Sequence, residues 1–253
     1  MNYFVKETSI VRKIWGKSDT ILFIFAGASA EFALNKAVDW LYYTGKLPSD
    51  PLGRLFSTVE YARKIVFASE ENALKAIDMM RQIHSAVEKS RGASIPDWAY
   101  RDVLFMLIHY SISAYEVLES KLSEEEKEEV YNVFYRVGIR MGLKELPSNY
   151  MDWLPVREQH LKENLQKSNF TEDLFKQYRK YLGLFRYRLL LEAQKLVVPS
   201  VVSRLLNFSG IKLLPPVLIL YKICKKIKID SFLKNLLLPK NYKKQIAELD
   251  IVH

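Results

Sequence analysis

The sequence holds one cysteine, Cys224, among its 253 residues. A single cysteine excludes a disulfide within the chain and a structural zinc site built from several thiolates. A chain without disulfides suits a reducing compartment. The first residues, MNYFVKETSIVRKIWGK, carry scattered charges and lack the apolar core and small-residue cleavage site of a signal peptide. We therefore expect a cytoplasmic protein.

Long apolar runs are also lacking. The most apolar stretch, residues 21–30, ends at Glu31 and is too short to span a bilayer. Glycine and proline number only nine each, which leaves room for long uninterrupted elements. The apolar residues recur with helical period, and strand-like alternation is almost absent. We predict an all-α fold, a single multi-helix globular bundle around a central apolar helix, in one domain over residues 1–253.

Acidic residues are scarce in the last part of the chain. Residues 199–253 hold ten lysines and arginines but three acids, a net charge of +7, while the whole chain carries +9. The remaining 198 residues are therefore nearly neutral, which argues against a nucleic-acid partner for the main body. Residues 211–253 mix apolar and basic residues, and we predict short helical pieces broken at Pro215–Pro216 and Pro239. They form a basic extension to a core over about residues 20–210.

Capping residues mark where the helices start. Residues 98–122 contain VLFMLIHYSISAY, which is apolar all round and typical of a helix at the centre of a bundle. The predicted helices are 20–45 after Asp19, 52–67 after Asp50 and Pro51, 70–90 after Ser69, 98–122 after Asp97, one from a capping box of Ser123 and Glu126, and one from Thr171 to Pro199.

Two of the four histidines are candidates for chemistry. His84 falls on the apolar stripe of its helix and His109 lies inside the apolar helix. A buried imidazole needs partners for its nitrogens, and these are either a metal or haem iron or, more commonly, a carbonyl or carboxylate. His160 lies in a polar helix and is expected to be exposed, and His253 is the last residue.

Arg54 and Thr58 form a second constellation. They are four residues apart and share one helix face, next to the core stripe. A cation and a hydroxyl placed there could hold a carboxylate such as a haem propionate. The alternative is an arginine that reaches solvent and a threonine that bonds its own backbone. Hydrolase elbows, phosphate loops, dinucleotide fingerprints and HExxH motifs are absent.

The order of several segments resembles the haem-dependent oxygenase family of latex-clearing protein (rubber oxygenase) and MpaB. DPLGRLFSTVEY (50–61) is similar to that family's segment with D-P, R-L and T, and IHSAV (83–87) to its H-x-x-V motif. DVLFMLIHYSI (102–112) resembles the W-V-H helix. The stretch LSEEEKEEVYNVFYRVGIRMGLKELPSNYMDW and the later QKLVVPSVVSRLL complete the resemblance, which covers about residues 20–210.

The resemblance implies an all-α fold that holds one b-type haem. It implies that His84 is the proximal iron ligand and that Arg54 and Thr58 lie near the haem as candidate catalytic residues. His109 is a further candidate for the cofactor's surroundings. Known members use dioxygen to cleave carbon–carbon double bonds in isoprenoid chains, so a hydrophobic substrate is expected.

Two alternatives stay open. Ser57 stands where the rubber oxygenase has a distal lysine, and Glu88 where the family often has an arginine. Both are compatible with a haem-free or non-catalytic helical binding protein of the same fold. The basic extension, residues 211–253, is either a peripheral membrane patch for anionic lipid or an amphipathic segment that packs on the bundle.

Overall fold

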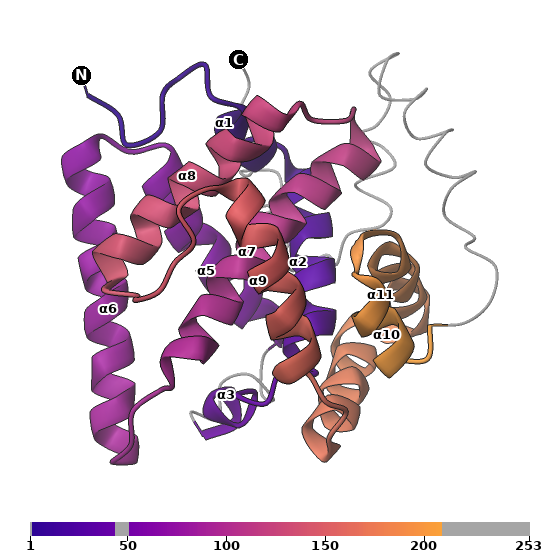
Figure 1. The fold of residues 1–253 in the computed structure, drawn as a ribbon. Coiled ribbons are helices and arrows are strands. Elements are labelled where there is room, and N and C mark those ends of the chain that lie inside the picture. The colour runs from indigo at the N-terminus through magenta and orange to yellow at the C-terminus, as the bar shows by residue number, and fades with distance from the viewer. Residues whose placement is uncertain (1, 44–50, 209–253) are drawn as a thin grey trace.

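The computed structural model describes residues 2–43 and 51–208, with the side chains of residues 51–57 outside that description. The described residues are mostly helical and contain no strands, only two isolated bridges, which confirms the all-α class (Figure 1). Their helices are α1 (Ile10–Trp15), α2 (Ser18–Phe32), α3 (Asp39–Tyr43), α5 (Pro51–Val66), α6 (Glu70–Arg91), α7 (Asp97–Leu118), α8 (Glu124–Met141), α9 (Tyr150–Glu163), α10 (Asn169–Val197) and α11 (Ser200–Leu205).

Helix α7 is the central helix, as predicted. It packs against α1, α2, α8 and α10, and Phe105, Ile108 and Tyr110 are fully buried. At Gly27 of α2 the two helices approach closely, because a Cβ atom there would lie 2.2 Å from the Tyr110 ring. Burial of this large apolar surface on every side stabilises the bundle.

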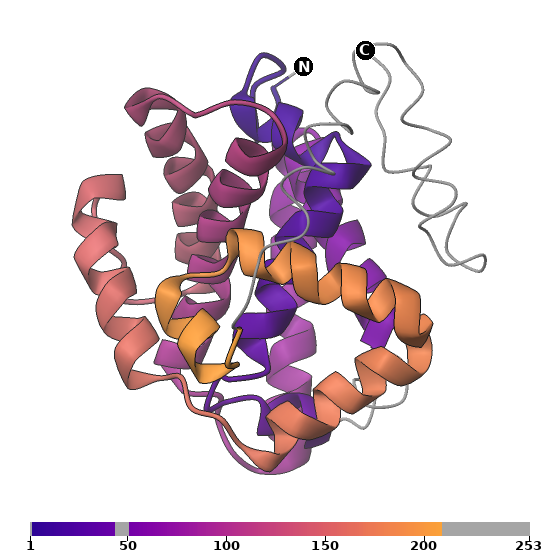
Figure 2. The same ribbon diagram turned by 90° about the vertical axis from the view of Figure 1, so that its right-hand side faces the viewer.

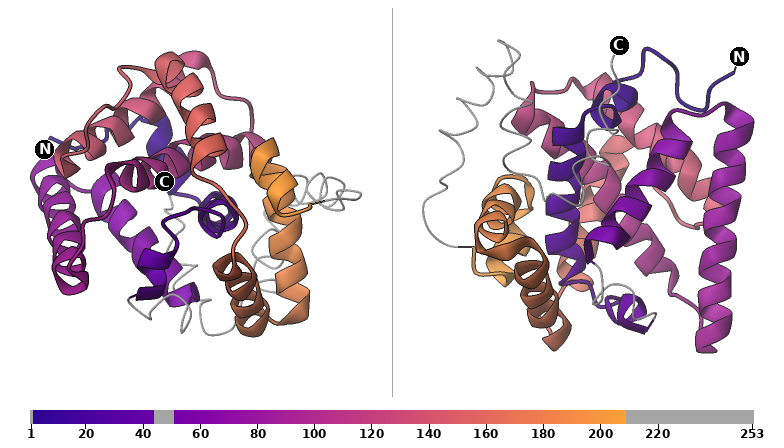
Figure 3. Two further views of the ribbon diagram at one scale, coloured as in Figure 1. Left: turned by 60° about the horizontal axis from the view of Figure 1, so that its bottom comes forward. Right: turned by 180° about the vertical axis from the view of Figure 1, so that it is seen from behind.

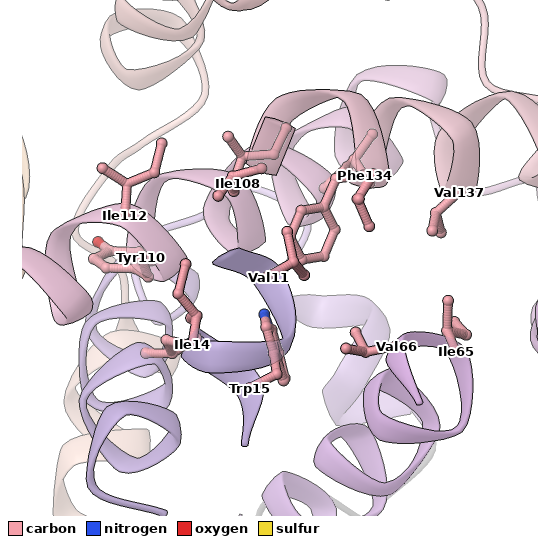
Figure 4. Packing of buried hydrophobic residues seen from close by; sticks show 14 of the residues in the cluster. Val11, Ile14, Trp15, Ile65, Val66, Ile108, Tyr110, Ile112, Phe134 and Val137 are labelled. Atoms are coloured by element: carbon pink, nitrogen blue, oxygen red, sulfur yellow. The ribbon is translucent and has the colours of Figure 1, made fainter. Parts of the chain in front are cut away.

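The short helix α1, which the sequence did not predict, supplies a large part of the core. Trp15 is fully buried and its indole Nε1 donates to Ser111 Oγ at 3.2 Å. Figure 4 shows Trp15 and Ile14 of α1 among side chains of α5, α7 and α8. The ring of Trp15 also makes an edge contact with Phe25 at 6.2 Å between centroids. The N-terminal segment is therefore part of the core.

Two predicted helix starts are confirmed by their capping bonds. Ser69 Oγ accepts from Asn72 N, and Ser123 with Glu126 forms a reciprocal capping box. The start predicted at Pro51 is also confirmed, because α5 begins there, and the remaining starts are shifted by one to three residues. Asp97 is the first residue of α7 rather than its cap, and α10 begins with a box of Ser168 and Thr171. Helix α10 ends before Pro199, as expected.

The prediction of one continuous helix over residues 20–45 is wrong. Helix α2 ends at Phe32, and α3 begins at Asp39. Asn35 replaces the helical hydrogen bonds between them: its Oδ1 accepts from Ala37 N at 2.9 Å, and its Nδ2 donates to Asp102 at 2.8 Å. A buried carboxylate on α7 therefore holds the chain in a non-helical turn.

Helix α10 bends sharply at Gly183, where φ is 71° and ψ is 167°. Only glycine adopts this conformation without strain. Figure 2 shows the two halves of α10 meeting at a corner at the edge of the molecule, and Figure 3 shows α10 from two further sides. The predicted basic extension, residues 211–253, lies outside the described residues. No described helix is long and apolar enough to cross a membrane.

Candidate functional site

Helices α5 and α6 carry three of the four predicted cofactor residues, Arg54, Thr58 and His84, and pack against each other across a short turn. Thr58 is half-buried on α5. Arg54 lies one helical turn before it, and its side chain falls among those outside the described residues. The shared helix face predicted for Arg54 and Thr58 follows from their common position on α5.

His84 lies on the side of α6 that faces the bundle. The residue is half-buried, as are Met80 and Val87 on the same stripe. Its ring packs edge-on against Tyr100 in the first turn of α7, with 5.3 Å between the centroids. The imidazole is therefore positioned by an aromatic neighbour in a partly apolar setting.

Glu88 supports this arrangement from the same helix. Its Oε1 accepts a hydrogen bond from Ile95 N at 2.7 Å and one from the Tyr100 hydroxyl at 3.3 Å. Burial and the nearby Glu88 carboxylate raise the pKa of Tyr100 above its ordinary value, so the phenol stays protonated. Glu88, which departs from the family pattern, thus closes the turn between α6 and α7 and positions the ring that contacts His84.

Two exposed apolar side chains lie on α6 shortly before His84. Ile83 precedes His84 and is 43% exposed, and Met79, one turn earlier, is 52% exposed. Tyr61 of α5 reaches Met79, where its hydroxyl lies 3.7 Å from the sulfur. A b-type haem needs one imidazole ligand and apolar walls. His84 supplies an imidazole, and Met80 and Val87 share its helix face, whereas Met79 and Ile83 are exposed apolar side chains on another side of α6.

His109 lies in different surroundings, nine residues beyond Tyr100 along α7, about 13 Å along the helix axis. His109 forms a hydrogen bond with the backbone of Val197 at the end of α10. Its Nε2 atom is buried without a hydrogen-bond partner in the described residues. Burial, and then the charge of Arg157, lower the pKa of His109 to about 3. His109 is therefore neutral at physiological pH, and its place near a cofactor stays a prediction.

A buried ion pair lies beside His109. Arg157 Nη2 of α9 donates to Glu31 Oε2 of α2 at 2.5 Å, and the Tyr110 hydroxyl donates to the same oxygen at 2.8 Å. Glu31 beside it raises the pKa of Arg157, against the lowering effect of burial. Neither member was a candidate from the sequence, where the only signal was that the apolar run of residues 21–30 stops at Glu31.

The expectation that His160 is exposed is wrong. Its side chain is 11% exposed, and Nδ1 lies 2.5 Å from Asp102 Oδ1. Asn164 Nδ2 donates to both oxygens of Asp102, and Asn35 donates to one. Asp102 thus joins α7, α9 and the turn after α2. The sequence shows His160 in a polar helix but not that this helix face meets a buried carboxylate.

Within residues 2–43 and 58–208, no group of three or more histidine, cysteine, aspartate or glutamate side chains is arranged to hold a metal ion. The candidate cofactor residues on these two helices are His84 on α6, and Thr58 and Arg54 on α5. His109 and its neighbours form a separate polar cluster between α2, α7, α9 and α10.

Comparison with known proteins identifies the class to which this all-helical chain belongs. The model of the family described as "ER-bound oxygenase mpaB/B'/Rubber oxygenase, catalytic domain" matches residues 15–219, about four fifths of the chain. The chain belongs to this family of oxygenase catalytic domains, which confirms the resemblance drawn from the sequence. No curated protein and no solved structure matches it.

Proposed function

We propose that this protein is a haem b-dependent oxygenase that acts with dioxygen on a hydrophobic substrate of isoprenoid or lipid type. The observation that carries the proposal is the position of His84: a half-buried imidazole on the bundle-facing side of α6, in edge contact with Tyr100 and on the same helix face as Met80 and Val87. Membership of an oxygenase family supports the class of reaction, and the rubber oxygenase in its description supports an apolar substrate.

His84 would supply the proximal ligand. The edge contact with Tyr100 limits rotation of the imidazole, and the hydrogen bond from Tyr100 to Glu88 fixes the phenol in turn. Residues that orient a ligand in this way tune its basicity and its geometry. A bound haem supplies an iron that binds and activates dioxygen.

Thr58 and Arg54 would act from α5. A guanidinium holds a carboxylate such as a propionate through two parallel hydrogen bonds, or polarises a group on the distal side, and the threonine hydroxyl would hydrogen-bond nearby. Met79 and Ile83 would exclude water from the face that they cover and contact the hydrophobic substrate or the porphyrin edge. These roles assign the catalytic side to α5 and the iron ligand to α6.

A haem titration tests the proposal. The protein freed of cofactor should take up haem to one equivalent per chain with a Soret band, and the loaded protein should consume dioxygen when given a short polyisoprene oligomer. Gln82→Ala, an exposed change on the same helix, should leave both results unchanged. A protein that stays colourless and retains apolar ligands on purification would contradict the proposal and favour the haem-free binding protein.

A further inference from the structure

The corner of α10 at Gly183 exposes large apolar side chains. Leu184 is 51% exposed, Phe185 62% and Tyr181 39%. They lie next to the residue at which the two halves of the helix meet, at the edge of the molecule (Figure 2). Three neighbouring apolar side chains of this size in water at a protruding corner are unusual for a surface without a partner.

The charges around this corner have one sign. The stretch of α10 from residue 174 to residue 191 contains five basic residues and no acidic one. Lys176, Arg179, Lys180 and Arg188 are exposed and form no ion pair within the described part of the chain. The basic residues stand on both sides of Leu184 and Phe185, so the apolar corner has a cationic border.

The inner side of the same helix is attached to the bundle. Leu174 and Tyr178 are buried against Ala33 and Val38 in a cluster at the end of α2, and Leu182 and Tyr187 pack at its border. Burial raises the pKa of Tyr178 above its ordinary value, so its phenol adds no negative charge. The corner is therefore a fixed surface whose apolar and basic side chains point away from the core.

We propose that residues 176–188 of α10, here called the α10 corner, dock on an anionic lipid bilayer. Peripheral membrane sites combine exposed leucine and aromatic side chains, which enter the headgroup region, with lysines and arginines that attract anionic headgroups. The α10 corner holds both, at one protruding place. A nucleic acid would match the basic residues but leave Leu184 and Phe185 in water.

Docking there would bring the protein to the phase in which apolar substrates are dissolved. These residues differ from the basic extension, residues 211–253, which the sequence offers as the alternative membrane contact. The vesicle assay needs no cofactor, so its outcome is independent of the haem titration.

Co-sedimentation of the full chain with vesicles tests the proposal. Binding should be strong with vesicles of phosphatidylcholine and phosphatidylserine, weak with phosphatidylcholine alone, and reduced by salt. Leu184→Ser/Phe185→Ser should weaken binding at least about tenfold, because both side chains leave the apolar phase. The matched control is Met151→Ser/Leu154→Ser on α9, which removes two other exposed apolar side chains, 64% and 39% exposed, and should change nothing.

A charge variant gives a second, independent readout. Lys176→Glu/Lys180→Glu changes two exposed residues without touching the core and should also weaken binding to the anionic vesicles about tenfold or more. If circular dichroism shows that the apolar double variant is not folded, vesicle binding by this charge variant tests the proposal instead. Binding that is insensitive to both variants, independent of phosphatidylserine, or lost only on deletion of residues 211–253 would overturn the proposal.

Discussion

Arg157 and Glu31 form an ion pair 126 residues apart in the sequence, with side chains 5% and 1% exposed. Both charged groups are buried away from water, so each needs the other to offset its cost of desolvation. The pair joins α9 to α2 next to the central helix, and the Tyr110 hydroxyl gives Glu31 a second hydrogen bond. The relative placement of these helices therefore depends on a polar contact inside an apolar bundle.

Removal of one member of this pair should be more harmful than removal of both. Arg157→Met leaves the Glu31 carboxylate buried with only Tyr110, and we expect a loss of about 3–5 kcal/mol in the free energy of unfolding. The double variant Glu31→Leu/Arg157→Met should lose less than either single variant, because it leaves no unpaired buried charge. Urea unfolding of the four proteins measures this, and strictly additive losses would contradict the account.

His109 should make stability depend on pH. Its pKa is lowered to about 3 in the folded protein, first by burial and then by Arg157, and lies near 6.5 in the unfolded chain. Between these values the unfolded state binds the extra proton. Stability from the neutral imidazole is therefore fully present above pH 6.5 and is lost as pH falls, by at most about 1.4 kcal/mol per pH unit.

The variant His109→Asn isolates this contribution, because the amide keeps a donor but does not titrate. We expect the free energy of unfolding of the natural protein to fall more steeply than that of the variant between pH 6.5 and pH 4. Parallel curves would show that the histidine titrates normally in the folded state.

Gly27→Ala tests the close approach of α2 and α7. Helix propensity alone predicts that alanine stabilises α2 by up to about 1 kcal/mol relative to glycine. The structure predicts the opposite sign, because the new Cβ would lie 2.2 Å from the Tyr110 ring and 2.9 Å from Val197. We expect a destabilisation of about 1–3 kcal/mol, since the core must shift. A higher melting temperature would contradict this packing.

Local patterns predicted much of the fold. The caps at Ser69 and Ser123 use side chains within three residues of the bonds that they make, so the sequence alone places the helix starts. The break at Asn35 depends on Asp102, which is 67 residues away, and a helical period continues across it in the sequence. Contacts of that kind carry no local signal.

The candidate site divides in the same way. His84 could be chosen because its neighbours at three and four residues are apolar, and the structure places it on the bundle-facing side. His160 was judged by its polar neighbours, but the contact that decides its burial comes from another helix. The role of Glu88 was hidden for the same reason, since its partner Tyr100 lies beyond the turn.

The absorption spectrum of the haem-loaded His84→Ala variant tests the central claim most directly. Removal of a proximal imidazole should shift and weaken the Soret band, and added imidazole, which enters the space left by the side chain, should restore the spectrum of the natural protein. Gln82→Ala should keep the natural spectrum throughout. If the His84→Ala spectrum equals that of the natural protein at full haem loading, His84 is not the iron ligand.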